Sequence, residues 1–295
     1  MKIAYIMQCH KCHEQINILA QTLSKNCHDI YLHIDKKSYI DSEIVINEHI
    51  KILDYKNRVD VRWGHISQVQ ATLHLIKEVL QSNEQYDYVC LISGQDFPVK
   101  SSIYIEDYLL KHNGAAFMDI MNVDTKMYKR FLKRNEVYTA QWMVNKSTFM
   151  RIVRNIWYAA TGGRYKTLSI YKRKLGSDTF YFGSSWWCLP FQAVKEMYEY
   201  VNENPNYYNF FTHTLCPDES FFQTLLMNHT SYKDKVLPLL TYVNWGEGGY
   251  SPNVFTMNDY KKLKAIANNE GVLFARKFDM EKDSKIIQKV LNELC

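Results

Sequence analysis

Apolar residues in the first 120 positions alternate between short runs and helical spacings. The runs Ile3–Met7, Ile30–Ile34 and Tyr88–Ile92 consist almost entirely of apolar residues and predict buried β-strands. Val59–Trp63, in which apolar residues alternate with Asp60 and Arg62, is also taken as a strand, the third in chain order. Uninterrupted apolar runs of this length are typical of strands that are covered on both faces.

Helical spacings lie between and after these runs. A helix is expected from about Glu14, with Ile16, Leu19 and Leu23 on one face, and another begins near Ser101. The clearest amphipathic pattern is formed by Ile66, Val69, Leu73, Ile76 and Leu80. In the less regular second half we expect helices at Phe191–Val201, Pro217–Met227, Asn258–Ala267 and Asp283–Leu294.

Alternating strands and helices predict an α/β fold with a mostly parallel central sheet flanked by helices. Ligands of such folds bind beyond the carboxyl ends of the strands. That rule places His10, Asp35 and the segment Ser93–Pro98 at one crevice, because each follows a predicted strand.

Composition adds bounds to this picture. Hydrophobic residues make up 46% of the 295 positions, enough for one large core, and the 14% that are aromatic could fill that core or stack on a ligand. Seven scattered cysteines, an odd number, predict reduced thiols rather than a disulfide framework. No segment reaches the roughly 18 apolar residues of a membrane span, so we expect a cytoplasmic protein, attached to a membrane only peripherally on its inner face.

The formal net charge of +5 is a mild excess whose distribution is uneven. No acidic residue occurs from Val137 to Ser177, whereas basic residues are frequent within segment 146–174. Phosphates, anionic lipid headgroups or an acidic glycan could meet such a segment, and a solvated basic face is the alternative. No recognised nucleic-acid motif accompanies it, so we expect no nucleic-acid partner.

Three short segments carry residues suited to chemistry. Cys9–His13 contains two cysteines and two histidines, but such close spacing rarely closes a tetrahedral metal site. Pro217 suits the first position of a helix, where the carboxylates of Asp218 and Glu219 complement the helix dipole, or one of them could be catalytic.

The third segment places Arg276 and Lys277 inside the apolar run Leu273–Phe278. Buried cations need an anionic partner, which could be a carboxylate or a diphosphate. An arginine and a lysine together suit phosphate well, one as a bidentate fork and one as a point charge.

Nine segments that follow one another along nearly the whole chain form a recognisable series. They are His10, Tyr31–Lys37, Arg62–Leu73, Leu91–Pro98, Gly183–Leu189, Pro217–Phe222, Val243–Trp245, Ser251–Asn253 and Leu273–Asp279. In this order they resemble glycosyltransferase family 14, which includes the core-2/I-branching N-acetylglucosaminyltransferases and the peptide O-xylosyltransferases.

The resemblance implies an inverting transferase with a GT-A-like fold, a UDP-sugar donor, a glycan acceptor and no metal or other cofactor. The chain also lacks the Asp-x-Asp triplet with which many nucleotide-sugar transferases bind manganese. We expect a single domain over residues 1–295, in which about 1–120 is the nucleotide-binding half and about 121–295 completes the donor and acceptor sites.

Roles carried over from the family fall on matching positions. Glu219 corresponds to the catalytic base, and Arg276 and Lys277 to the cations that hold the UDP diphosphate. The residues expected at the uridine or donor sugar are His10, Asp35, Asp96 and Ser251. Trp186 and Trp245 are expected to line the acceptor and donor pocket.

The sequence departs from the animal members in several ways. We expect no membrane anchor, stem, matching disulfide cysteines or additional C-terminal domain, and Ser185 stands where the xylosyltransferases have an acidic residue. These departures place a peptide acceptor in doubt. We therefore expect a bacterial enzyme of surface polysaccharide synthesis that transfers N-acetylglucosamine or xylose to a glycan hydroxyl. The basic segment 146–174 would contact a membrane or a lipid-linked acceptor.

Two alternatives remain at this stage. The chain could be a catalytically silent glycan- or nucleotide-binding protein of the same fold. It could also bind nucleic acid through residues 137–177, although no motif supports that function.

Overall fold

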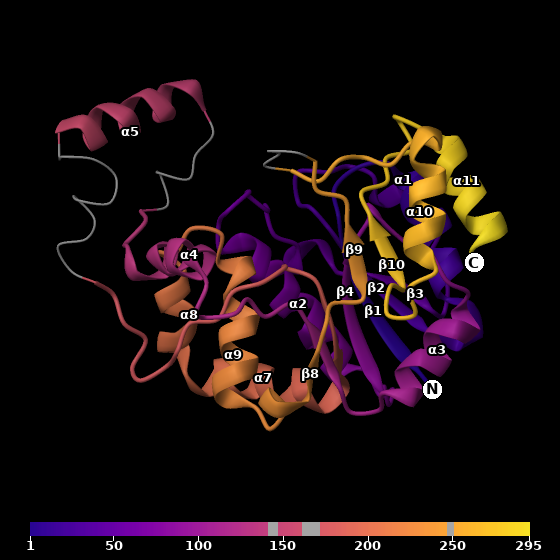
Figure 1. The fold of residues 1–295 in the computed structure, drawn as a ribbon, viewed down its shortest axis with the longest axis horizontal. Helices are drawn as coiled ribbons and strands as arrows, with labels where there is room; N and C mark the ends of the chain where they lie inside the picture. The colour runs from indigo at the N-terminus through magenta and orange to yellow at the C-terminus, as the bar shows by residue number, and fades with distance from the viewer. Residues whose placement is uncertain (141–146, 161–171, 247–250) are drawn as a thin grey trace.

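The computed structural model describes residues 1–140, 147–160, 172–246 and 251–295 (Figure 1). A seven-stranded sheet has the order β3-β2-β1-β4-β7-β6-β8. Strands β3, β2, β1 and β4 run parallel, β7 is antiparallel to both of its neighbours, and β6 is parallel to β8. The α/β fold and the mostly parallel sheet are thus confirmed. The strands are β1 Ile3–Cys9, β2 Asp29–Ile34, β3 Ile50–Ile52, β4 Tyr88–Ser93, β6 Ala116–Met118, β7 Trp187–Pro190 and β8 Val236–Leu237.

A second sheet of three short strands lies at the carboxyl end of β4. Its order is β5 (Asp96–Pro98), β10 (Phe274–Arg276) and β9 (Thr241–Val243). Strand β10 is antiparallel to β5 and parallel to β9. The end of the chain therefore returns to the loop that follows β4.

Two hydrophobic cores cover the faces of the large sheet, because side chains alternate along each strand. In β1, Tyr5 and Met7 enter one core and Ala4 and Ile6 the other. The first core is covered by α1 (His13–Leu23), α3 (Ser102–Lys111), α10 (Tyr260–Ala267) and α11 (Ser284–Glu293), seen together in Figure 1. The second is covered by α2 (Ser67–Gln81), α7 (Phe191–Glu203), α8 (Pro205–Phe211) and α9 (Phe221–His229).

The expected helices are all found, with boundaries within a few residues, but the strand at Val59–Trp63 is wrong. The backbone N–H of Val59 donates to His33 Nε2 at 2.9 Å, and its carbonyl accepts from the Lys36 N–H at 3.0 Å. The segment is therefore a loop tied to the end of β2. The third strand is β3, whose three residues are too few to form a pattern.

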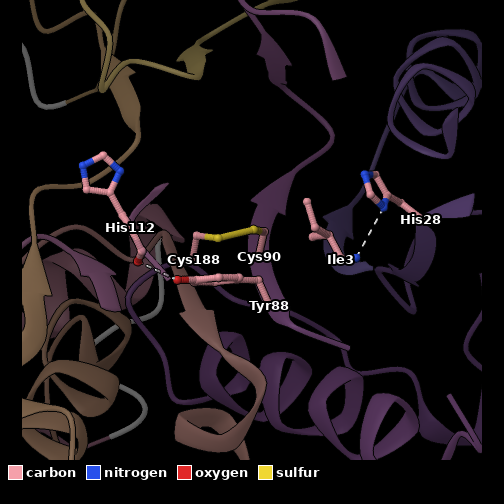
Figure 2. Close-up of a disulfide and its surroundings, with 6 residues drawn as sticks. All are labelled: Ile3, His28, Tyr88, Cys90, His112 and Cys188. Atoms are coloured by element: carbon pink, nitrogen blue, oxygen red, sulfur yellow. Dashed lines mark hydrogen bonds between the residues drawn. A yellow bond between two sulfur atoms is a disulfide. The ribbon is translucent and has the colours of Figure 1, made fainter. Parts of the chain in front are cut away.

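A disulfide joins Cys90 of β4 to Cys188 of β7 (Figure 2). The prediction of reduced thiols is wrong for this pair, whereas Cys9, Cys12, Cys27, Cys216 and Cys295 are not joined in disulfides. The two cysteines are 98 residues apart and become direct cross-strand neighbours only through the register of the sheet. Cysteine spacing along the chain could not reveal that proximity.

Two basic helices lie at one end of the molecule's long axis. Helix α4 spans Lys126–Glu136 and α5 spans Thr148–Ala160, and α5 lies outside the body of the fold in Figure 1. Of the basic segment 146–174, Lys146 and residues 161–171 lie outside the described residues. In the described part of the chain, no helix combines the length and apolar character needed to cross a bilayer.

Candidate functional site

The loops after β1, β2 and β4 meet at one edge of the large sheet, as the fold rule predicts. The Asp35 N–H donates to the Cys9 carbonyl at 2.8 Å, and the Gly94 N–H donates to the Gln8 carbonyl at 3.0 Å. These hydrogen bonds fix the loops that carry His10 and Asp35 beside the loop that leads into β5.

Asp96 and Arg276 face each other across the small sheet. They are direct partners in the antiparallel register of β5 and β10, and Arg276 Nε lies 3.4 Å from Asp96 Oδ1. Asp96 Oδ2 accepts from the Ser93 N–H at 2.7 Å. Burial raises the pKa of the fully buried Asp96 carboxyl, and the Arg276 guanidinium opposes that rise.

Arg276 is a buried cation with unused hydrogen-bonding capacity. It is only 6% exposed, and its guanidinium carbon lies 4.3 Å from the centre of the Trp186 ring, close enough for a cation–π interaction. Within the described residues, Nε and Nη1 have no hydrogen-bond partner. Such donors are costly when left unsatisfied, so this side chain is suited to an anionic ligand.

Lys277 and His10 belong to the same electrostatic cluster. Burial and the neighbouring Arg276 charge lower the pKa of Lys277, with Asp96 opposing. Burial, then Lys11 and Lys277, lower the pKa of His10, and Asp35 opposes the shift. The lowered pKa favours the neutral imidazole, which can both donate and accept hydrogen bonds.

Glu219 ends the short 3₁₀ helix Pro217–Glu219 that precedes α9. Its side chain is 34% exposed, and its Oε2 accepts a hydrogen bond from Arg134 Nη1 of α4. Burial, followed by the charge of Asp218, raises the pKa of Glu219, whereas Arg134 lowers it. A partly exposed carboxylate that is held in place on one oxygen has the properties of a general base.

Trp186 and Ser185 connect the cation to this carboxylate. Trp186 lies against Arg276, and the adjacent Ser185 Oγ donates to Asp218 Oδ2 at 2.6 Å. Asp218 is the chain neighbour of Glu219. One dipeptide thus contacts both the predicted phosphate-binding residue and the residue beside the predicted base.

Gly183 fixes the start of this connecting segment. Its N–H donates to the carbonyl of Glu219 at 3.0 Å. A Cβ at this position would lie 1.8 Å from the carbonyl oxygen of Asp119, at the end of β6. Only glycine allows this approach, which gives the Gly-Ser sequence of the motif a steric reason.

Trp245 and Ser251 lie beside the small sheet. Trp245 is 61% exposed and follows β9 through Asn244, whose N–H donates to the Arg276 carbonyl at 3.0 Å. Trp245 also forms an isolated bridge with Pro252, next to the exposed Ser251. No hydrogen bond between described residues joins either side chain to the cations, so their pocket roles stay predictions.

Sequence reasoning missed Arg134 and the pair Lys11–Asp279. Arg134 lies 85 positions before Glu219, and Lys11 Nζ contacts Asp279 at 2.8 Å across 268 positions. Neither pair has a local signal. Within α4, Arg134 does differ from the exposed cations. Its guanidinium carbon lies 3.8 Å from the centre of the Phe131 ring.

Among the described residues, no three His, Cys, Asp or Glu side chains gather as a metal site requires. The requirement for a metal in the reaction is a separate matter, and metal independence stays a prediction.

The model of the family described as core-2/I-branching enzyme matches residues 3–266. The chain belongs to this family. The resemblance deduced from the nine segments is confirmed, and with it membership of a family of glycosyltransferases.

Similar proteins include two animal xylosyltransferases. Xylosyltransferase oxt of Drosophila melanogaster is 26% identical over 305 residues, which cover 95% of this chain and 32% of that protein. A xylosyltransferase of Ciona intestinalis is 26% identical over 318 residues, which cover 100% of this chain and 34% of that protein. The chain thus spans about a third of the length of these relatives.

Among solved structures, core-mannan synthase A from Aspergillus fumigatus is similar with a TM-score of 0.36 and 11% identity. The match covers 79% of this chain and 71% of that one. A likeness this loose does not bear on the chemistry.

Proposed function

We propose that this family member is an inverting glycosyltransferase that moves a sugar from a UDP-sugar to a glycan hydroxyl without a metal ion. N-acetylglucosamine or xylose is the proposed sugar, and a β-linkage is formed. The proposed setting is bacterial surface polysaccharide synthesis in the cytoplasm, with a glycan or lipid-linked glycan as the acceptor.

The observation that carries this proposal is the environment of Arg276. A nearly buried guanidinium with two nitrogens lacking hydrogen-bond partners lies beside Lys277 in the described structure. Asp96 balances one positive charge, but Arg276 Nε, 3.4 Å from Asp96 Oδ1, and Nη1 still lack hydrogen-bond partners among the described residues. A diphosphate supplies both the missing acceptors and the additional negative charge.

In the proposed reaction, Glu219 accepts the proton of the acceptor hydroxyl while the hydroxyl oxygen attacks the anomeric carbon of the donor sugar. The bond to UDP breaks on the opposite face, and the leaving diphosphate gains negative charge. Arg276 and Lys277 stabilise that charge from fixed positions, which is the role of preorganised donors. One carboxylate is sufficient, because inversion by direct displacement needs a base and no covalent nucleophile.

The remaining residues bind the donor in this proposal. Neutral His10 and the Asp35 carboxylate bind the uridine, and Asp96 orients Arg276 near the ribose. Ser251 contacts the uridine or the donor sugar, while Trp186 and Trp245 provide flat faces for the donor and acceptor sugars.

The test is UDP release from a panel of UDP-sugars and glycan acceptors, each with and without EDTA. Release from one donor that persists in EDTA supports the proposal and identifies the sugar. Complete dependence on added manganese would contradict the metal-free reaction. UDP binding without release from any donor and acceptor would instead indicate a silent binding protein of the same fold.

Calorimetry with UDP tests the two cations directly. Arg276→Ala and Lys277→Ala should each weaken UDP binding by about 1.5–3 kcal/mol, the usual value of a hydrogen bond to a charged group. Lys264→Ala, at an exposed position of α10, serves as the matched control and should bind UDP as the wild type does. Unchanged affinity in both site variants would remove them from the proposed site.

A further inference from the structure

Helix α5 exposes an apolar stripe that a soluble helix ordinarily buries. Phe149, Ile152, Val153 and Ile156 are spaced at i, i+3, i+4 and i+7, so they share one face. Phe149 is 72% exposed and Ile156 is 63% exposed. A stripe of this kind requires a partner, because exposed apolar surface costs free energy in water.

The opposite face of α5 is polar and basic. It carries Arg151, Arg154 and Asn155. In a helix of 3.6 residues per turn, these positions are about half a turn away from the apolar stripe. This helix carries no acidic residue. A helix with one apolar face and arginines on the other is typical of segments that lie in the interface of a membrane.

Helix α4 contributes a second, cationic stripe at the same end of the molecule (Figure 1). Lys126, Lys129, Arg130 and Lys133 follow the same i, i+3, i+4, i+7 spacing, and all four are exposed. The other face is fixed to the protein, since the Tyr128 hydroxyl donates to the Phe180 carbonyl at 2.7 Å. The helix therefore holds its cations toward solvent.

Charge complementarity decides between the occupants of this surface. The sequence contains no acidic residue from Val137 to Ser177, and the four exposed cations of α4 lie just before this stretch. A second copy of the chain would bring the same cations against each other and be repelled. An anionic bilayer surface satisfies the apolar stripe and the cations together.

We propose that α4 and α5 form a docking surface for an anionic lipid bilayer, with the stripe of α5 in the interface and the cations of α4 at the headgroups. Arg173, by contrast, is not part of this surface. Its guanidinium donates to the carbonyls of His213 and Phe210, which ties it to the protein.

Docking through these helices brings the bilayer to the side of the molecule that carries the proposed base. The helix that exposes the cations also supplies Arg134, which holds Glu219. An acceptor attached to a lipid would therefore meet the site from the membrane side. The docking itself rests only on the two helices and not on the transferase reaction.

Flotation of the purified protein with vesicles tests the surface without an activity assay. The wild type should float with vesicles containing phosphatidylglycerol and not with phosphatidylcholine alone. Lys126→Gln/Lys129→Gln/Arg130→Gln should weaken binding by about fivefold for each cation removed. Phe149→Ser/Ile152→Ser/Ile156→Ser should reduce binding by at least about tenfold. The same reduction is expected at high salt, because salt screens charges but not the burial of apolar area.

Matched controls change similar residues elsewhere. Val45→Ser/Ile46→Ser alters exposed apolar residues in the loop before β3, and Lys261→Gln/Lys264→Gln alters exposed cations of α10. Both should float as the wild type does. UDP calorimetry and circular dichroism verify that each variant is folded, so a failure of docking is distinct from a failure of the proposed function.

Three results would overturn the proposal. The wild type could fail to float with anionic vesicles, or the control variants could lose as much binding as the α4 and α5 variants. Light scattering could also show an oligomer that the α5 variant dissociates, which would assign the stripe to contacts between copies.

Discussion

At the scale of single residues, Glu219 has neighbours with opposite effects on its proton affinity. Burial and Asp218 raise its pKa, and the contact with Arg134 lowers it. In its proposed role as the base, Glu219 must be deprotonated to act, so these neighbours would set the lowest pH at which the proposed reaction proceeds. Arg134 favours the charged form of the carboxylate and orients it.

The pH dependence of kcat/KM should report this balance. Activity should fall as the pH decreases through the raised pKa of Glu219, since protonation removes the base. Asp218→Asn removes a like charge, so the acidic limb of the profile should move to lower pH. An acidic limb that stays in place would mean that Asp218 does not act on the catalytic group.

Glu219→Gln removes the base and keeps the shape of the side chain. Turnover should decrease by about 10²–10⁴-fold, the usual contribution of a general base, while UDP affinity stays nearly unchanged. Steady-state kinetics together with calorimetry separate the two effects. Wild-type turnover in this variant would reduce Glu219 to a residue that begins a helix.

Motifs named candidate residues, but they did not reveal which residues contact one another. Arg276 and Asp96 lie in motifs, and the structure pairs them across two strands. Arg134 lies in no motif, and its partner is 85 positions away. Contacts at such separations depend on the complete fold, which the local pattern does not contain.

At the scale of elements, the segment before β7 is held by its close approach to β6. Gly183→Ala would place a methyl group 1.8 Å from the Asp119 carbonyl oxygen. We expect a loss of about 1–3 kcal/mol in the free energy of unfolding, and lower turnover, because the backbone must move away. Denaturant titration measures the loss.

Gly271→Ala is the matched control for this variant. The nearest atom to its new methyl group is the hydroxyl of Tyr108 at 3.1 Å, the end of a side chain that can move. Its unfolding midpoint should stay close to that of the wild type. Equal losses in the two variants would mean that the destabilisation comes from replacing a glycine in general and not from the close approach of Gly183 to Asp119.

The disulfide between β4 and β7 gives a prediction at the same scale. Alkylation of the unfolded protein without reductant should label five cysteines, and after reduction all seven. Cys90→Ala/Cys188→Ala should lower the free energy of unfolding by about 2–4 kcal/mol. The exposed Cys27→Ser is the control, and labelling of all seven without reductant would contradict the bond.

Elements were predictable where their pattern was long or bounded by a cap. Helix α3 begins after Ser101, whose hydroxyl accepts from the Tyr104 N–H, as its sequence indicates. Strand β3 has only three residues and was missed. The alternating segment Val59–Trp63 was wrongly assigned as a strand. The backbone hydrogen bonds of Val59 go to a histidine ring and a loop, partners that the sequence pattern does not reveal.

At the scale of the whole molecule, the proposed donor site combines the loop after β1 with the strand β10 near the other end of the chain. Ligand binding to such a site stabilises the segments that form it. UDP should therefore slow hydrogen exchange in residues 274–279 and 183–186 and leave β3 unchanged. Arg276→Ala should abolish this protection, and UDP that binds without protecting either segment would place the nucleotide elsewhere.

The order of motifs along the chain predicted the fold class and the sheet edge at which the candidate loops meet, because strand ends of a parallel sheet share one edge. It did not predict the small sheet, in which β10 inserts between β5 and β9. That arrangement joins strands from residues 96, 241 and 274, and each is too short to be assigned from its own sequence.

The position of β10 in the sequence also determines when the proposed phosphate-binding residues are synthesised relative to the large sheet. All strands of the large sheet precede residue 238, whereas Arg276 and Lys277 follow. A nascent chain on the ribosome would therefore contain every strand of the main sheet before the proposed diphosphate-binding residues are made. If these residues hold the nucleotide as proposed, a UDP resin would retain chains that include β10 and release shorter chains that contain the same strands of the large sheet.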